Sequence, residues 1–242
     1  SITLRERGGH SNPTVISTGS AVLNAVGYSN PGLDAAMQEF EQVGQVGIPV
    51  LASVVGKDAE EFARVAERLM KLDFAALEIP LSCPHTPGYG TLAGHGTPEA
   101  TERIARAVRE AVDGPLFVKL SPNVPGLGEV ALAALEGGAD GITAVNTMGP
   151  GMVIDVDSGE PVLDFRAGGV SGPALRPVAV RCVYDVYAAM RREKRSAPII
   201  GVGGVSAGRH ALEMVMAGAS AVGIGTAAYQ RGTGVFGRVA SE

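Results

Sequence analysis

Cys83 is the first residue whose type and setting suggest chemistry, because it follows a short apolar run at residues 74–79. Such a run predicts a buried parallel strand, and parallel α/β folds place reactive side chains at the carboxyl ends of strands. A free cysteine is most often a small buried hydrophobe. Here Pro80, Pro84 and a loop with few apolar side chains indicate instead that the thiol faces a cleft. Since an ordinary thiol has a pKa of about 8.5, a setting that favours thiolate would let Cys83 take a proton near neutral pH.

Lys119 and two neutral polar residues stand at other predicted strand ends. Lys119 has apolar neighbours on both sides, and a buried lysine is rarely without a partner. It could form a Schiff base, hold a phosphate or stabilise an anionic cofactor, and the residues alone leave these roles open. Asn146 and Thr147 suit a ligand that carries an amide. Asn24 is a further candidate, although a turn or helix-capping role fits an asparagine there equally well.

Two glycine-rich segments follow the last two predicted strands, at residues 201–205 and 223–226. Glycines at such turns let backbone N–H groups reach an anion at the start of the next helix, and phosphate sites after the last two strands of a barrel are common. Glycine at one strand–helix turn is also plain geometry. Two such turns in consecutive units favour a phosphate ligand.

The elements that position these residues alternate between strands and helices, which predicts a parallel sheet with right-handed crossovers. Residues 5–20 and 148–172 read as loops, the second with a short hairpin around Asp157 to Gly159. Pro80 is expected to end its strand, since proline has no N–H to donate. The predicted strands cover 49–54, 74–79, 116–120, 141–145, 198–202 and 221–225, and the predicted helices cover 33–46, 58–72, 97–112, 127–136, 173–192 and 207–217.

Residues 1–4 read as the end of a further strand, so six strands are complete and one is a stub. The sequence therefore predicts an α/β fold, a (β/α)₈ TIM barrel that lacks its N-terminal strand and its final helix. No linker or change of composition marks a second domain. We expect a single domain over residues 1–242.

Composition narrows the class of protein. The 242 residues include 45% hydrophobic and 19% charged residues, which allows a large core and argues against disorder. A net charge of −5 without a basic run argues against a nucleic-acid surface. No apolar run reaches the ~18 residues of a membrane span, and no metal-ligand spacing is present, so we expect a cytoplasmic protein without metal. Cys182 is expected in a helix core, and His10, His95 and His210 on the surface or in loops.

Several segments occur together and in a specific order: Ser1-Ile-Thr-Leu, Leu23-Asn-Ala-Val-Gly, Asn30-Pro-Gly, Leu81-Ser-Cys-Pro-His, Val118-Lys-Leu-Ser-Pro-Asn, Val145-Asn-Thr, Gly169-Val-Ser-Gly-Pro-Ala, Gly201-Val-Gly-Gly-Val and Gly225-Thr. As a set they resemble the dihydroorotate dehydrogenase family, the FMN enzymes of pyrimidine synthesis. Among its classes the chain looks most like class 1, type B, of bacteria and archaea.

The resemblance implies oxidation of (S)-dihydroorotate to orotate. Cys83 would remove the C5 proton while the C6 hydride passes to the flavin, and Lys119 would stabilise the reduced, anionic flavin. The implied cofactor residues are Ser1, Lys119, Val145, Gly172, Gly203, Gly204, Gly225 and Thr226. The implied orotate-binding residues are Asn24, Val26, Gly27, Tyr28, His85, Asn146 and Thr147.

The resemblance also implies partners. Type B members have a homodimeric core and work with a second subunit, which carries FAD and a 2Fe–2S cluster and passes electrons to NAD⁺. A fumarate-dependent class 1A enzyme is one alternative, and a flavin- or phosphate-binding barrel with impaired catalysis is another.

Three departures from the family pattern stand out. Pro80 replaces an asparagine whose amide bonds to flavin and substrate in the family. His85 replaces another asparagine, and histidine can still donate and accept hydrogen bonds. The family's first strand, a lysine just before Ser1 and most of the final helix after Thr226 are not found in the chain.

Overall fold

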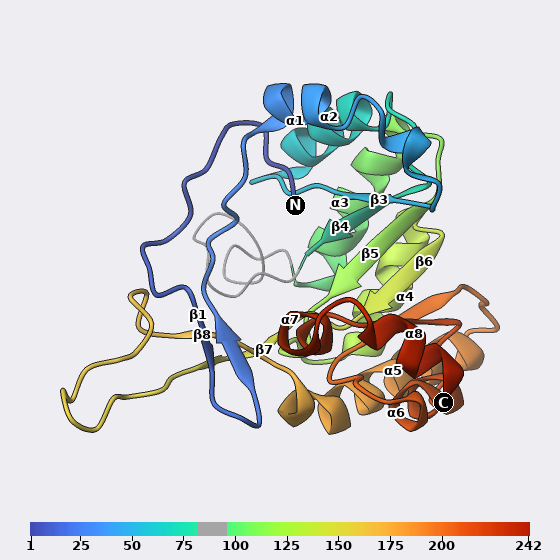
Figure 1. Ribbon diagram of the computed structural model, residues 1–242. Coiled ribbons are helices and arrows are strands. Elements are labelled where there is room, and N and C mark those ends of the chain that lie inside the picture. Colours follow the sequence, from blue (N-terminus) through green and yellow to red (C-terminus); the bar gives the residue numbers. More distant parts are fainter. Residues whose placement is uncertain (82–95) are drawn as a thin grey trace. The chain divides into compact units, whose positions relative to one another are not determined.

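The computed structural model describes residues 1–81 and 96–242, and Figure 1 draws the chain. The chain divides into two compact units, each built from several segments. Unit 1 comprises Ser1–Gly9, Gly27–Lys119 and Glu129–Ile142, and unit 2 comprises His10–Val26, Leu120–Gly128 and Thr143–Glu242. The single domain expected from the sequence stays a prediction.

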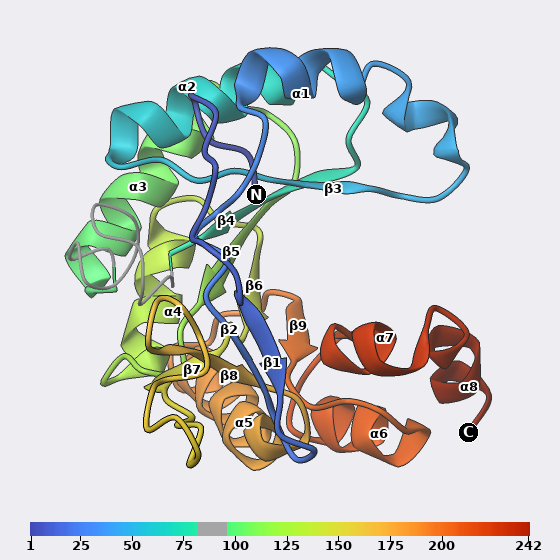
Figure 2. The same ribbon diagram turned by 60° about the vertical axis from the view of Figure 1, so that its left-hand side comes forward.

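Unit 1 has a parallel sheet covered by helices. Its strands pair in the order β3 (Leu51–Ser53), β4 (Ala76–Pro80) and β5 (Leu116–Leu120). Helices α1 and α2 pack on each other and α2 packs on α3, as Figure 2 shows. The helices are α1 (Leu33–Glu39), the 3₁₀ helix η1 (Val43–Val46), α2 (Ala59–Leu69), α3 (Pro98–Ala111) and α4 (Leu127–Glu136).

The two longest helices of unit 1 each begin at a side-chain cap. Asp58 accepts a hydrogen bond from the Glu61 N–H at 2.9 Å, and Thr97 accepts one from the Ala100 N–H at 3.2 Å. Each cap satisfies an N–H that the first turn leaves without a partner. Pro98 fills the first position of α3, where a helix has no use for its missing N–H. The helix expected over 33–46 was wrong in its extent, because α1 ends at Glu39 and a separate 3₁₀ turn follows.

Pro80 ends β4, as expected, but it does not interrupt the pairing with β5. It pairs with Lys119 of β5, and the next residue, Leu81, donates to the Lys119 carbonyl at 3.0 Å. In a parallel strand the N–H groups alternate between the two neighbours. The Leu77 and Leu81 N–H groups point to β5, so Pro80 lacks a donor only on the side where β3 has already ended at Ser53. Proline therefore costs no bond to β5.

Alternation gives β4 and β5 two unlike faces. One face holds the fully buried residues Leu77, Ile79, Leu116, Val118 and Leu120, each at most 2% exposed. The other face holds Glu78 and Lys119, which keep some exposure to solvent. The two charged side chains therefore lie on the face opposite the buried apolar residues.

The stub at the start of the chain pairs as predicted. The Ile2 N–H donates to the Ser53 carbonyl at 2.8 Å and the Val55 N–H donates to the Ile2 carbonyl at 2.9 Å, which makes a parallel bridge beside β3. The strand β6 (Gly141–Ala144) begins in unit 1 and ends in unit 2.

Unit 2 contains a four-stranded antiparallel sheet that the sequence reading missed. Its order is β1 (Val15–Ser17), β2 (Val22–Asn24), β8 (Gly168–Ser171) and β7 (Met148–Gly151). The expected loops over 5–20 and 148–172 therefore contain strands. A small core of Ala21, Leu23, Ala25 and Leu163 supports this sheet. The hairpin expected near Asp157 is confirmed, since the Asp155 N–H donates to the Glu160 carbonyl at 2.9 Å.

The rest of unit 2 is a parallel pair of strands with helices. The strands β9 (Ile199–Val202) and β10 (Ala221–Gly223) are parallel. Helix α6 packs against α5 and α8 (Figure 1). The helices are η3 (Pro173–Leu175), α5 (Arg176–Arg192), α6 (Gly208–Met216), α7 (Thr226–Arg231) and α8 (Val235–Ser241), and within residues 1–81 and 96–242 none is long and apolar enough to cross a membrane.

The stability of unit 1 should depend on the packing of α2 against α3. Phe62 on α2 is 0% exposed. Replacing it by alanine should lower the free energy of unfolding by about 3–5 kcal/mol, because a large cavity cannot fully collapse. Urea unfolding followed by circular dichroism measures this loss. Phe236→Ala is the matched control, since Phe236 is 47% exposed and surface substitutions change stability by only about 0.5 kcal/mol. Equal losses in the two variants would contradict the prediction.

Candidate functional site

Lys119 lies beside a carboxylate that the sequence reading did not single out. Its Nζ is 3.4 Å from Oε1 of Glu78, and the two side chains are 24% and 16% exposed. Both project from the same face, because Lys119 pairs with Pro80 and Glu78 precedes Pro80 by two residues on β4. A glutamate inside a predicted buried strand was the available signal, since acidic residues are rarely buried without a partner.

Ser1 and Ser53 extend this polar face in unit 1. The Ser1 Oγ lies 2.8 Å from the Ser53 Oγ, and Ser53 pairs with Glu78 across β3 and β4. Ser1 and Ser53 therefore adjoin Glu78 on the polar face at the ends of β3 and β4.

Unit 2 brings three of the predicted phosphate residues together. A Cβ on Gly172 would lie 3.2 Å from Cγ2 of Thr226, and a Cβ on Gly204 would lie 2.8 Å from the Gly172 carbonyl oxygen. Gly172 and Gly204 have φ angles of +82° and +69°, which favour glycine. Thr226 Oγ1 donates to Ser171 Oγ at 2.8 Å. These contacts make a tight cluster of backbone around Gly172.

The backbone donors of this cluster suit an anion. Among residues 1–81 and 96–242, the N–H groups of Gly204, Val205, Gly225 and Thr226 donate to no other residue. Among the described residues, and apart from its own chain neighbours, a Cβ on Gly225 would meet no atom within 4 Å, so open space adjoins these donors. Unpaired N–H groups at loops and helix starts are the groups that bind phosphate in many proteins.

Gly203 and Val145 have different surroundings. A Cβ on Gly203 would collide with the Ala179 side chain on α5, so plain strand–helix packing already requires glycine there. Val145 is 1% exposed, and its N–H donates to the Val202 carbonyl at 3.0 Å. Their roles toward a cofactor stay predictions.

The predicted orotate-binding residues are divided between the units. Asn24 lies in β2, where its backbone pairs with Gly169, so it is neither a turn residue nor a helix cap. Its half-buried side chain has no hydrogen-bond partner in the part of the chain that the structure describes. Asn146 Oδ1 accepts a hydrogen bond from the Thr147 N–H at 2.9 Å, which fixes the turn after β6.

Three further predicted residues lie near the segment that leaves β2. In unit 2, Val26 is 39% exposed and its carbonyl accepts a hydrogen bond from the His10 N–H at 3.0 Å. In unit 1, Gly27 and Tyr28 have φ angles of +74° and +57°. The Tyr28 carbonyl accepts a hydrogen bond from Nδ2 of Asn30 at 2.7 Å, which holds this unusual turn.

Cys83, His85 and His95 lie outside the residues that the structure describes. Cys182 lies on α5 and is 8% exposed, which confirms a core position, and burial raises the pKa of its thiol to about 11. His10 lies in a loop, as expected, with its ring stacked on Phe165 at 4.0 Å between centroids. His210 lies on α6, where burial, together with Arg176 and Arg209, lowers its pKa.

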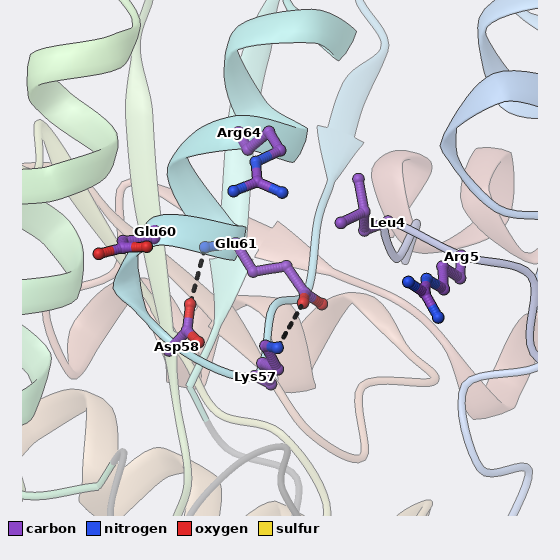
Figure 3. Close-up of a pocket in the computed structure, with 7 residues that line it drawn as sticks. All are labelled: Leu4, Arg5, Lys57, Asp58, Glu60, Glu61 and Arg64. Carbon is purple, nitrogen blue, oxygen red and sulfur yellow. Dashed lines mark hydrogen bonds and ion pairs between the residues drawn. The ribbon is translucent and has the colours of Figure 1, made fainter.

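A charged pocket of about 390 Å³ lies at the start of α2 in unit 1 (Figure 3). Glu61 extends toward Lys57, with 3.9 Å between the charged groups, and Asp58 caps the helix. Three cationic and three anionic side chains balance each other, so the pocket favours no charge of ligand. None of the predicted site residues is among its lining residues, Leu4, Arg5, Lys57, Asp58, Glu60, Glu61 and Arg64.

Comparison with known proteins gives one consistent family. A family model described as dihydroorotate dehydrogenase matches residues 1–242. The chain is 46% identical over 224 residues to a Methanosarcina acetivorans protein named dihydroorotate dehydrogenase B (NAD(+)), catalytic subunit, covering 92% of this chain and 70% of that protein. A Methanocaldococcus jannaschii protein of the same name is 40% identical over 246 residues, covering 100% of this chain and 78% of that protein.

A solved structure supports the fold. The dihydroorotate dehydrogenase of Eimeria tenella, in a complex with ferulenol, aligns with a TM-score of 0.80 at 23% identity, covering 100% of this chain and 72% of that one. The chain therefore has the α/β architecture of a TIM-barrel enzyme, as its alternating strands and helices predicted.

Proposed function

Because the chain belongs to the dihydroorotate dehydrogenase family of flavin-dependent oxidoreductases of pyrimidine synthesis, we propose that it oxidises (S)-dihydroorotate to orotate with FMN as its cofactor. The observation that carries the proposal is the 40–46% identity to type B catalytic subunits over 92–100% of the chain. The polar cluster around Lys119 and the backbone cluster around Gly172 provide groups that suit this reaction.

The residues present fit FMN. The open space beside Gly225 and the unpaired N–H groups around Gly204 and Thr226 suit the phosphate. The Lys119 ammonium, near the ends of β4 and β5, suits an anionic ring system. When bound, FMN supplies the two-electron acceptor for the hydride that leaves C6 of the substrate.

The chain itself handles the proton and the orientation of the substrate. We assign the removal of the C5 proton to the thiolate Sγ of Cys83, since a general base must accept a proton as the C–H bond breaks. Asn24, Asn146 and Thr147 carry neutral donors and acceptors that match the amide groups of the dihydropyrimidine ring. The remaining members of this proposed pocket are Val26, Gly27, Tyr28 and His85, and Ser1, Val145, Gly172 and Gly203 complete the proposed cofactor set.

We further propose that the electrons pass to NAD⁺ through a separate subunit that carries FAD and a 2Fe–2S cluster, around a homodimeric core in the cytoplasm. The names of the related proteins include both NAD(+) and a catalytic subunit. The sequence contains only two cysteines, Cys83 and Cys182, and a 2Fe–2S cluster is usually held by four. The cluster would therefore belong to the partner.

A flavin-binding barrel without turnover is the second candidate. Pro80 favours it, because this residue lies on the same face as Lys119 and has no side-chain amide to bind flavin or substrate. Such a protein would bind FMN and keep it oxidised in the presence of dihydroorotate.

Type B enzymes and fumarate-dependent enzymes differ in the final electron acceptor that they use. The full-length catalytic protein, loaded with FMN and mixed with its partner subunit, should reduce NAD⁺ when dihydroorotate is added. Absorbance at the nicotinamide band measures this reaction. The same catalytic protein alone should show no turnover with fumarate. Turnover with fumarate alone would contradict the type B assignment.

Cys83→Ala should slow flavin reduction by dihydroorotate about 10²–10⁴-fold while FMN stays bound, because the general base is lost. Cys83→Ser should fall between, since a hydroxyl is harder to deprotonate. Stopped-flow bleaching of the oxidised flavin band, measured against pH, should show one thiol ionisation that both variants lose or move.

Cys182→Ala is the control for this experiment. The pKa of Cys182 is raised to about 11, so its thiol stays protonated through the neutral range and cannot supply the ionisation. Cys182→Ala should keep the parent rate and pH profile. A Cys83→Ala protein with the parent rate and profile would refute the assignment of the base, and a parent protein that keeps its flavin oxidised would favour the second candidate.

Gly225→Val should weaken FMN binding about tenfold or more, a loss of ~1.4 kcal/mol, because its side chain would enter the open space beside the free N–H groups. The free energy of unfolding should hardly change, since in the part of the chain that the structure describes only its own chain neighbours lie within 4 Å of the new Cβ. Gly8→Val is the matched control, with equally open surroundings. Fluorescence titration with FMN measures both. Unchanged binding in Gly225→Val would place the phosphate elsewhere.

A further inference from the structure

The ion pair between Glu78 and Lys119 is unusual within unit 1 for its burial. Their charged atoms are 3.4 Å apart, with side chains 16% and 24% exposed. Five other ion pairs between described residues of this unit each have at least one side chain exposed by 54% or more, as in Arg106–Glu102 and Lys71–Glu67. Partly buried charges cost desolvation energy unless they are paired. The pair therefore exists for a reason beyond covering the surface.

The backbone fixes the carboxylate relative to the ammonium. Glu78 lies two residues before Pro80, and Pro80 pairs directly with Lys119, so both side chains leave the same face of adjacent strands. In the part of the chain that the structure describes, no other carboxylate lies within 4 Å of the Lys119 ammonium. Lysine has a long flexible stem with about 2 kcal/mol of rotamer entropy. A fixed carboxylate restricts that freedom.

We propose that Glu78 is the positioning residue for Lys119: its carboxylate holds the ammonium where the reduced flavin gains its charge. The inference rests on the proposed function, since it takes FMN as the bound cofactor. Glu78 acts through Lys119 and has no proton-transfer role of its own. Its carboxylate is close enough to the ammonium for a charge-assisted hydrogen bond after a small shift.

A direct action of Glu78 on the flavin would shift the midpoint potential of bound FMN in the opposite direction. If Glu78 acted directly on the flavin as a negative charge, removing it would raise the midpoint potential, because the reduced anion would be repelled less. If Glu78 holds Lys119, removing it lowers the potential, because the ammonium loses its place beside the anion. The midpoint potential of bound FMN therefore separates positioning from direct electrostatics.

The experiment is a double-mutant cycle on the FMN-loaded protein. Lys119→Met should lower the midpoint potential, and Glu78→Ala should lower it by at least half of that shift. The double variant should match Lys119→Met alone, because residues that act as a unit are not additive. Glu78→Asp keeps the charge but falls one carbon short, so it should also lower the potential. A raised potential in Glu78→Ala, or additive shifts, would overturn the proposal.

A measurement without flavin tests the pair itself. In FMN-free protein, acetic anhydride should acylate Lys119 about tenfold faster in Glu78→Ala than in the parent, because the long, flexible side chain loses the 3.4 Å ion pair that holds it in a partly buried place and then reaches the reagent more often. Lys57, Lys71 and Lys194 are the internal references in the same peptide map. Glu102→Ala is the matched control, since it removes an exposed glutamate from the pair with Arg106, and it should leave Lys119 unchanged.

The outcomes distinguish the two proposals. A parent protein that binds no FMN, or whose FMN stays oxidised with dihydroorotate, refutes the proposed function, and the acylation rates then decide whether Glu78 holds Lys119. A parent that turns over while Glu78→Ala leaves both the acylation rate and the potential unchanged refutes the positioning role alone.

Discussion

The parallel pairing of β4 with β5 is the constraint on which the candidate chemistry depends. Its register sets Pro80 opposite Lys119 and Glu78 opposite Phe117. One face is then filled by Leu77, Ile79, Leu116, Val118 and Leu120, and burial of these apolar side chains stabilises the register because a shift by one residue would expose them. The same pairing places Glu78 and Lys119 on the other face, so no additional ordering of the backbone is needed to bring them together.

The cluster around Gly172 in unit 2 is built from backbone groups. In unit 2, backbone rather than side chains provides the polar groups, and glycine is required because neighbouring segments approach closely at Gly172 and Gly204. Backbone N–H groups lose little entropy on binding because the fold already orders them. An ammonium on a long stem differs, since it must be restrained by a partner such as Glu78. The two clusters therefore need different kinds of support.

The sequence alone predicted most of the parallel architecture. Apolar runs identified β3, β4, β5 and β9, and the helices expected over 58–72 and 97–112 correspond to α2 and α3. It missed the antiparallel sheet of unit 2 because β1 and β2 have three residues each and β7 and β8 are rich in glycine. Such strands form through partners distant in sequence, so local propensity carries little signal.

Site residues could be predicted from the sequence where their residue type is unusual for its position, and less well where the type is common there. Cysteine, lysine and glycine at strand ends stood out, and unit 2 does bring Gly172, Gly204 and Thr226 together. Glu78 did not stand out, because a glutamate in a strand is read as a solvated residue until its register to Lys119 is known. Contacts between strands are set by register, which single-residue patterns do not encode.

Pro80 is compatible with the strand pairing but offers no side-chain group for hydrogen bonding. Its missing N–H costs β5 nothing, because that N–H would point to the side where β3 has ended. Its ring, however, gives the polar face no hydrogen-bonding group at this position. The face keeps its register and its charges. In the proposed pocket, the orientation of a pyrimidine ring would then rest on Asn24 in β2 and on Asn146 and Thr147, which follow β6.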